Sequence, residues 1–228
     1  ETGHLFGRLA HDEHSQLMRR AGVADHEFRQ MQELYEEMGQ FSDPLDAEDL
    51  LPLVDGQELE FGSGTLRVIH TPGHTPGSCS FIREADRTIV CGDCVLKRIT
   101  PNQVLSVDPV DPTRRFRSLG EYLVSLARLS SLSPTLVYGG HGEPVTDFEE
   151  IFNRYVRSID DRQRKVIGLV PKDGITAFET AKLLFQRSFD QDVHRFLAIS
   201  EAAAHLDHAF FEGRIGMREA DGVDIYFR

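Results

Sequence analysis

The chain of 228 residues is long enough for one or two domains with a sizeable core, and its 40% hydrophobic and 27% charged residues are ordinary for a globular protein. A formal net charge of -12 disfavours nonspecific attraction to nucleic acid or to an anionic membrane. No apolar run approaches membrane-spanning length, and three cysteines are too few for a disulfide framework and fit a reducing cytoplasm.

The first third of the chain predicts a strand, two helices and a hairpin. A strand is expected over residues 5–10 and a helix over residues 13–21. A second helix, over residues 25–38, carries apolar side chains at helical spacing, as is typical of a core face or of a lid over a cleft. Residues 57–61 and 65–69 predict a β-hairpin because glycines separate two short runs of strand-forming residues.

Three later loops carry residue types that bind metals, each at the end of a predicted strand. Two Pro-Gly pairs force tight turns on either side of His74, Asp93 follows a buried strand, and His141 stands among glycines after another. Zinc takes imidazole and carboxylate ligands, and neighbouring glycines let the backbone approach closely. The three loops therefore predict a metal site, against the alternative that both histidines are ordinary turn residues. The strands concerned are predicted over residues 66–69, 79–82, 88–91 and 136–138.

The second half of the chain is predicted to be mostly helical. An amphipathic helix is expected to begin at residues 111–113 and reach residue 129, and a charge-rich helix is expected over residues 147–166. The tail then has two helices and a hairpin with an Asp-Gly turn, which is winged-helix architecture. These last elements are expected over residues 176–185, 194–211, 214–218 and 223–227.

The runs TPGHTPGS, TIVCGD and GGHGEP resemble the last three metal-binding motifs of the metallo-β-lactamase superfamily, nearest its glyoxalase II-like hydrolases. The resemblance extends from about Thr2 to the C-terminus. It implies that His74 binds one metal, that Asp93 bridges two, and that His141 binds the second. Two zinc ions are implied for a complete site, with iron or manganese as alternatives.

The His-x-His-x-Asp-His signature with which the family's ligands begin does not occur in this chain. His11 and His14 have the wrong spacing and are expected at a helix start and on its exposed face. The expected fold class is therefore α/β: an αββα metallo-β-lactamase sandwich over residues 1–168 with its N-terminal part missing, then a small winged-helix domain over residues 169–228. On this view the chain is either an incompletely represented hydrolase or an inactive, truncated or degenerate relative that binds or supports a partner.

The same resemblance implies a zinc-dependent hydrolase that acts on a small-molecule thioester, ester or lactone. A metal-bound hydroxide would attack the carbonyl carbon, and Asp93 would be the catalytic residue because it holds the metal pair and the nucleophile in place. The long loop after Asp93 is a natural wall for a pocket. In it Lys97, Arg98 and Asn102 could contact a substrate carboxylate or phosphate. The alternative is a solvated loop charge, which suits Arg98 equally well and suits Lys97 better.

Some relatives with a winged-helix tail resemble ribonucleases, so a phosphodiesterase of the same superfamily is the alternative activity. The acidic balance of the tail disfavours nucleic acid as a partner. Cys91 and Cys94 form a C-x-x-C pair, which is interpreted as two buried strand thiols beside Asp93 rather than a redox or zinc motif. An apolar sheet face or an exposed sheet edge where the missing half should pack would favour a homo-oligomer.

Overall fold

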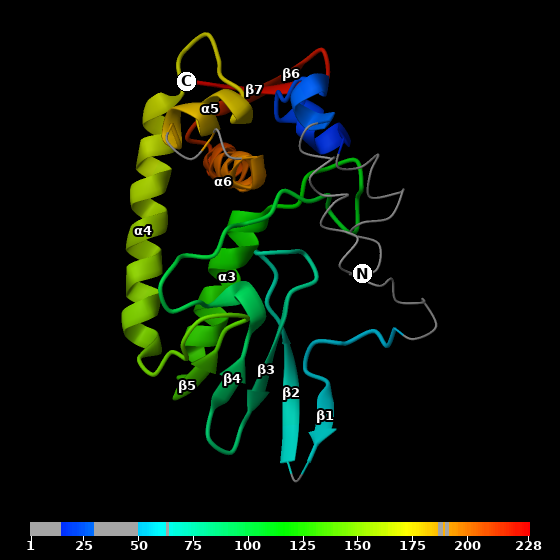
Figure 1. Ribbon diagram of the computed structural model, residues 1–228, viewed down its shortest axis with the longest axis vertical. Coiled ribbons are helices and arrows are strands. Elements are labelled where there is room, and N and C mark those ends of the chain that lie inside the picture. The colour runs from blue at the N-terminus through cyan, green and yellow to red at the C-terminus, as the bar shows by residue number, and fades with distance from the viewer. Residues whose placement is uncertain (1–14, 30–49, 63, 187–188, 190–191) are drawn as a thin grey trace. The chain divides into compact units, whose positions relative to one another are not determined.

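The computed structural model describes residues 15–29, 50–62, 64–186, 189 and 192–228 (Figure 1). The strand expected over residues 5–10, the two histidines at 11 and 14, and most of the helix expected over residues 25–38 lie outside these ranges. Residues 15–20 and 25–29 are helical, as predicted.

The chain divides into two units that alternate along the sequence. The sheet unit consists of Pro52–Val104 and Arg117–Arg162. The helical unit consists of the described residues of Glu1–Leu51, Leu105–Phe116 and Gln163–Arg228. The domain boundary that we expect between residues 168 and 169 stays a prediction.

Five strands form the sheet in the order β1-β2-β3-β4-β5 (Figure 1). The first four strands pair antiparallel with their neighbours, whereas β4 and β5 are parallel. Strands β2, β4 and β5 therefore run in the same direction, and their carboxyl ends lie at one edge of the sheet. The predicted hairpin and the predicted buried strands are confirmed within a residue or two. The strands are β1 (Glu58–Phe61), β2 (Gly64–His70), β3 (Cys79–Arg83), β4 (Thr88–Val90) and β5 (Leu136–Tyr138).

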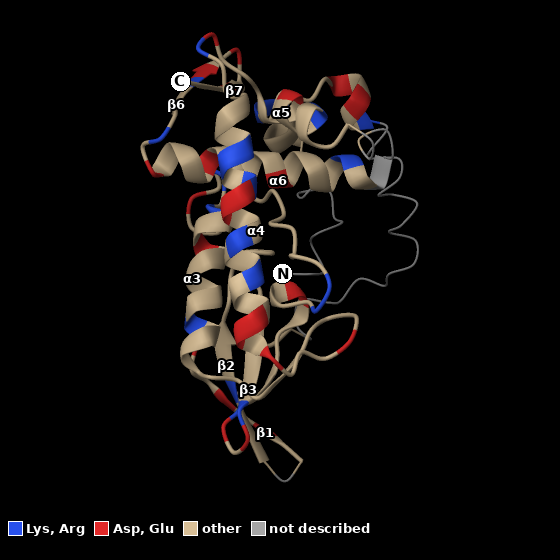
Figure 2. Ribbon diagram, turned by 90° about the vertical axis from the view of Figure 1, so that its left-hand side faces the viewer, with Lys and Arg blue, Asp and Glu red and all other residues tan. Residues whose placement is uncertain are grey.

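One face of this sheet is buried at β3, β4 and β5. Ile82, Ile89 and Val137 lie side by side across β3, β4 and β5, and each is at most 1% exposed. Helices α3 (Ser118–Ser131) and α4 (Phe148–Leu169) lie along this side of the sheet (Figures 1 and 2). Their inward-facing aliphatic and tyrosine side chains form the other half of the core. Removing these side chains from water stabilises the fold. These include Leu119, Tyr122, Leu126, Leu129, Ile151, Tyr155 and Ile159.

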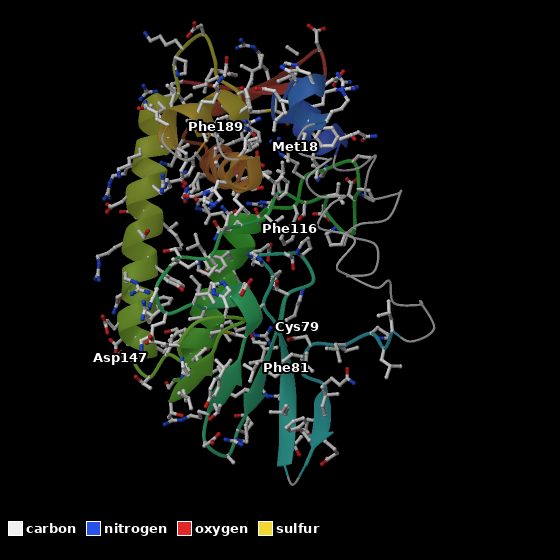
Figure 3. The ribbon with its side chains drawn as sticks, viewed as in Figure 1. Met18, Cys79, Phe81, Phe116, Asp147 and Phe189 are labelled. Carbon is white, nitrogen blue, oxygen red and sulfur yellow. The ribbon has the colours of Figure 1, made fainter. Side chains whose placement is uncertain are left out.

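The opposite face of the sheet is apolar but less buried. Phe81, Val90 and Tyr138 pair across β3, β4 and β5, and the last two are 45% and 43% exposed. Phe61 at the end of β1 is 73% exposed. Figure 3 marks Cys79 and Phe81 on β3, where alternation along a strand places both on this same face. The self-association that such a face would favour stays a prediction.

The predicted start of α3 is wrong. We expected the helix to begin at residues 111–113, but it begins at Ser118. The Asp111 carboxylate accepts hydrogen bonds from the backbone N–H and the hydroxyl of Thr113, at 3.1 and 2.6 Å. A side chain that binds the backbone two residues on stabilises a turn instead of a helix. Residues Val107 and Arg115 then pair as an isolated antiparallel bridge.

The tail of the helical unit follows the predicted order of two helices and a hairpin. Helix α5 (Ala177–Leu184) starts with a capping box, in which Thr176 and Glu179 bind each other's backbone N–H. Helix α6 (Asp192–Phe211) buries small and aliphatic residues, and β6 (Gly216–Ala220) pairs antiparallel with β7 (Val223–Phe227). The turn is formed by the predicted Asp-Gly pair, with positive φ at both residues.

A buried ion network ties residues 105–116 to the tail within this unit. The guanidinium of Arg115, 5% exposed, pairs with Asp207 at 2.7 Å and with Asp224 at 2.8 Å. It also contacts the hydroxyl of Tyr226, which donates to Asp207 at 2.5 Å. Arg20 also pairs with Asp224, at 3.1 Å. Each buried charge thus has an opposite partner, as burial in a low-dielectric core requires.

The outer surface carries both signs of charge. Acidic and basic residues are interspersed along α4 (Figure 2). In the part of the chain that the structure describes, no helix combines the length and the apolarity needed to span a bilayer.

Candidate metal centre

His74 lies on the loop that joins β2 to β3, and this loop packs against α3. The hydroxyl of Ser125 donates to the Pro72 carbonyl at 2.7 Å. Gly73, with φ of 145°, lies directly on Tyr122, so that an added Cβ would come within 2.5 Å of the Tyr122 Cα. Only glycine allows both this backbone conformation and this close approach. The loop is therefore fixed against a helix rather than held by its prolines alone.

Asp93 lies in the short 3-10 turn η3 (Gly92–Cys94) directly after β4. The buried hydroxyl of Tyr122 donates to the Cys94 carbonyl at 2.9 Å. Tyr122 thus contacts both the His74 loop and the Asp93 turn. Further along, Tyr155 on α4 accepts from the Leu96 backbone N–H at 2.8 Å and holds the chain as it leaves the turn.

His141 follows β5 on a glycine-rich turn that packs on the Asp93 turn. The N–H of Gly140 donates to the Gly92 carbonyl at 2.8 Å. An added Cβ at Gly140 would lie 2.4 Å from Asp93 Oδ1. The second glycine of the motif is therefore needed because the carboxylate occupies the space that any side chain would fill.

The three predicted ligands meet at the sheet edge where β2, β4 and β5 end. His74 Nε2 lies 3.7 Å from Asp93 Oδ2, and His141 Nε2 lies 3.8 Å from Asp93 Oδ1. Each carboxylate oxygen thus faces a different imidazole. These separations exceed hydrogen-bond lengths of roughly 2.7 to 3.2 Å. They are closer to the separation of about 3.4 Å expected for nitrogen and oxygen ligands on one tetrahedral zinc.

The ring of His74 is oriented by the backbone. Its Nδ1 lies 2.6 Å from the Asn102 carbonyl oxygen, which can only accept, so Nδ1 carries the proton. The neutral ring then has its lone pair on Nε2, the atom that faces Asp93. A metal-binding histidine is commonly held in its tautomer by such a contact to its other ring nitrogen.

The donor set suits zinc and also suits iron or manganese, since imidazole and carboxylate bind all three. Across the described residues, however, no group of three or more His, Cys, Asp or Glu side chains could hold a metal by itself. His74 and His141 instead form two pairs that share Asp93. Each pair supplies two ligands, and a four-coordinate metal would need others.

The two predicted substrate-binding residues have different surroundings. Arg98 is 78% exposed and pairs with Glu143 at 2.5 Å, and Lys97 pairs with the same carboxylate at 3.0 Å. These cations hold the pKa of the Glu143 carboxyl below its ordinary value. Asn102 is brought to His74, but through its main-chain carbonyl.

Sequence reasoning missed Tyr122, Gln103 and Glu143. Tyr122 lies on the inward face of α3, and helical spacing does not reveal what an inward side chain contacts. Glu143 stands in the GGHGEP motif, two residues after His141, and this position was the one available signal. Burial of Gln103, at 2% exposure, has no counterpart in the sequence pattern.

These features define an α/β protein with a candidate metal centre at the carboxyl edge of its sheet. The model of the Metallo-beta-lactamase superfamily matches residues 10–141, and the chain belongs to that superfamily.

Proteins of known sequence agree with this assignment. A probable metallo-hydrolase of Bacillus subtilis is 30% identical over 161 residues, which are 71% of this chain and 49% of that protein. A beta-lactamase-like protein 2 homolog of Caenorhabditis elegans is 27% identical over 135 residues, 59% of this chain and 41% of that protein. The chain thus spans about half the length of the curated relatives it matches.

Solved structures also resemble this one, and two of them illustrate the likeness. A metallo-beta-lactamase family protein of Thermus thermophilus has a TM-score of 0.80 and 27% identity, covering 99% of this chain and 67% of that chain. A beta-lactamase domain protein of Burkholderia ambifaria has a TM-score of 0.66 and 29% identity, covering 77% and 52%. The mixed α/β fold of this chain is therefore that of the superfamily.

Proposed function

We propose that the protein is a metal-dependent hydrolase, of the glyoxalase II-like type, that cleaves a thioester, ester or lactone in a small molecule. One observation carries the proposal: the two oxygens of Asp93 face two different imidazoles, at 3.7 and 3.8 Å. A carboxylate shared in this way can bridge two cations. Membership of the superfamily and similarity to the Bacillus protein, a probable metallo-hydrolase, support the hydrolytic reaction.

His74 with Asp93 would hold one divalent cation and His141 with Asp93 the other, zinc being the preferred metal. Cations there would lower the pKa of water, to give a nucleophile near neutral pH, and would polarise the carbonyl. The chain's own residues set the directions of the ligands. The Asn102 carbonyl keeps the proton of His74 on Nδ1, and Gly140 leaves space for the Asp93 carboxylate.

We propose that Arg98 recognises a negatively charged group of the substrate. Its side chain is 78% exposed and is held by Glu143, a residue of the His141 turn. A substrate carboxylate could replace Glu143 on the guanidinium, because an exposed ion pair contributes roughly 0 to 1 kcal/mol and exchanges readily. Asn102 could add a contact through its side chain without losing the main-chain contact to His74.

The test compares the wild-type protein with Asp93→Asn and Asp93→Ala in two measurements. Metal content is determined by elemental analysis after zinc loading, and hydrolysis is followed with an acyl thioester, an aryl ester, a γ-lactone and bis(p-nitrophenyl) phosphate. We expect the wild type to bind metal and to cleave one of the carbonyl substrates, and we expect Asp93→Asn to lose both properties while keeping its circular dichroism spectrum. Full activity in Asp93→Ala would show that Asp93 is not the catalytic residue.

The same panel separates the alternatives. Cleavage of the phosphodiester alone would identify the protein as a phosphodiesterase. Metal-free wild-type protein without activity on any substrate would identify an inactive member of the superfamily.

We also propose that α5, α6 and the β6–β7 hairpin form a winged-helix-like domain, and that the protein acts in the cytoplasm. The order helix, helix, hairpin supports the first proposal, and three free cysteines support the second. The exposed acidic residues of the hairpin, Glu219 and Asp221, do not suit a phosphate-binding face. We expect fluorescence anisotropy to detect no salt-sensitive binding of RNA or DNA.

A further inference from the structure

The loop of residues 101–104 holds His74 at two points. The Asn102 carbonyl oxygen accepts from the ring Nδ1 at 2.6 Å, and the N–H of Val104 donates to the His74 carbonyl at 2.9 Å. One contact fixes the ring and the other fixes the main chain. The orientation of this ligand therefore depends on the shape of a loop remote from it in sequence.

Gln103 closes that loop. Its side chain is buried, with 2% of its surface exposed, and its Nε2 donates to the Pro101 carbonyl at 2.8 Å. Through this bond the side chain of Gln103 holds the main chain two residues before it. The Asn102 carbonyl lies between these two points, so its direction depends on them. The bond is shielded from water, so no solvent molecule competes for the carbonyl.

We propose that Gln103 is a positioning residue for His74. By holding the Pro101 carbonyl, its amide keeps the Asn102 carbonyl on the His74 Nδ1–H and thereby keeps the lone pair on Nε2, toward Asp93. A ring without this acceptor would exchange its proton between the two nitrogens and would rotate more freely. The tautomer part of this inference stands on the hydrogen bonds alone, and its consequence for metal affinity rests on the function proposed above.

The neighbouring residue provides a matched control. Asn102 acts on His74 through its main-chain oxygen, which every amino acid retains. Asn102→Ala should therefore leave the His74 ring in place, whereas Gln103→Met keeps a buried side chain of similar size but removes the amide donor. The two substitutions are at adjacent positions, but only Gln103→Met is expected to change the His74 ring.

The experiment reads the tautomer of His74 in metal-free protein from the 15N chemical shifts of the imidazole nitrogens, and then the affinity for zinc by calorimetry. We expect one tautomer, protonated at Nδ1, in the wild type and in Asn102→Ala, and a mixture in Gln103→Met. Hydrogen bonds to a metal-binding histidine contribute about 10- to 100-fold to metal affinity. We therefore expect the zinc affinity to fall by that factor in Gln103→Met and by less than about threefold in Asn102→Ala.

Several outcomes would overturn the inference. It fails if Gln103→Met melts at a lower temperature but keeps a single tautomer and wild-type affinity, because the residue would then be only structural. If that variant does not fold, the wild type still decides, since a His74 ring with its proton mainly on Nε2 contradicts the argument. A wild type that binds no zinc would refute the proposed metal centre and leave the tautomer measurement intact.

Discussion

The substitution Gly140→Ala tests how closely the His141 turn must approach Asp93. The N–H of Gly140 is held by the Gly92 carbonyl at 2.8 Å, so the backbone cannot move away without losing that bond. The new Cβ would lie 2.4 Å from Asp93 Oδ1. Because ordinary contacts between carbon and oxygen begin at about 3.4 Å, the carboxylate must move by roughly 1 Å.

A movement of that size acts on both sides of the candidate centre. Oδ1 lies 3.8 Å from His141 Nε2, and rotation of the carboxylate also moves Oδ2, which lies 3.7 Å from His74 Nε2. A misplacement of about 1 Å in a catalytic geometry can cost roughly 100-fold in turnover. We expect losses of that order in turnover and of about 10- to 100-fold in zinc affinity. The free energy of unfolding should change by only about 1 kcal/mol, since the clash involves the end of one side chain.

Gly142→Ala on the same turn is the matched control. Its Cβ would meet nothing within 4 Å, but its φ of 82° is strained for alanine. It should therefore lower stability by about 1 kcal/mol without displacing the Asp93 carboxylate. Zinc calorimetry and urea unfolding of both variants separate steric displacement from general destabilisation.

The reasoning is refuted if Gly140→Ala binds zinc as the wild type does. It is also refuted if both variants lose affinity in proportion to their loss of stability. In that case the glycines would serve only the fold of the turn.

Three further predictions concern the surrounding structure. Tyr122→Phe should lower the free energy of unfolding by about 1 to 3 kcal/mol, because the buried Cys94 carbonyl loses its donor; an unchanged urea midpoint would contradict this. Arg115→Ala should cost about 3 to 5 kcal/mol, because it removes the cation that pairs with the buried Asp207 and leaves the buried Asp224 with Arg20 alone; a loss below about 1 kcal/mol in urea unfolding would show that the network is dispensable. Burial raises the pKa of Cys91 to about 12 and also raises that of Cys94, so both thiols stay protonated at pH 8. Iodoacetamide should then modify only Cys79 in the native protein and all three thiols in urea, as mass spectrometry would show; rapid native labelling of Cys91 would contradict its burial.

The sequence was sufficient for the strands and for the three candidate ligand loops because the signals are local. Alternating and β-branched residues predict strands, and Gly and Pro predict where they end. What the pattern did not provide is the strand order. The common direction of β2, β4 and β5 makes their ends converge, and it follows from which strands pair.

The error at the start of α3 also has a local cause. An Asp-Pro-Thr run is compatible with a helix N-terminus, but the same Asp111 side chain can bind Thr113 within a turn. The bridge between Val107 and Arg115 favours the turn. Pairing between distant segments thus decided between two local structures of similar preference.

Asn102 shows why the surroundings of a site are harder to predict than its ligands. A ligand must have a particular side chain, so its type is visible in the sequence. The contact of Asn102 to His74 uses the main chain, and any residue at that position would make it. What the sequence must specify is the path of the main chain at residues 101–103, where the buried amide of Gln103 binds the Pro101 carbonyl.

The arrangement at Asp93 links these levels. Parallel pairing of β4 and β5 brings the two turns together, and the Gly140 to Gly92 hydrogen bond sets their separation. At that separation a carboxylate fits only where no Cβ is present, and its two oxygens then face imidazoles from different loops. A change in strand register would therefore move the ligands by about 3.3 Å, far more than any metal site tolerates. A sequence that sets the strand pairing of this sheet therefore also sets the geometry of the candidate centre.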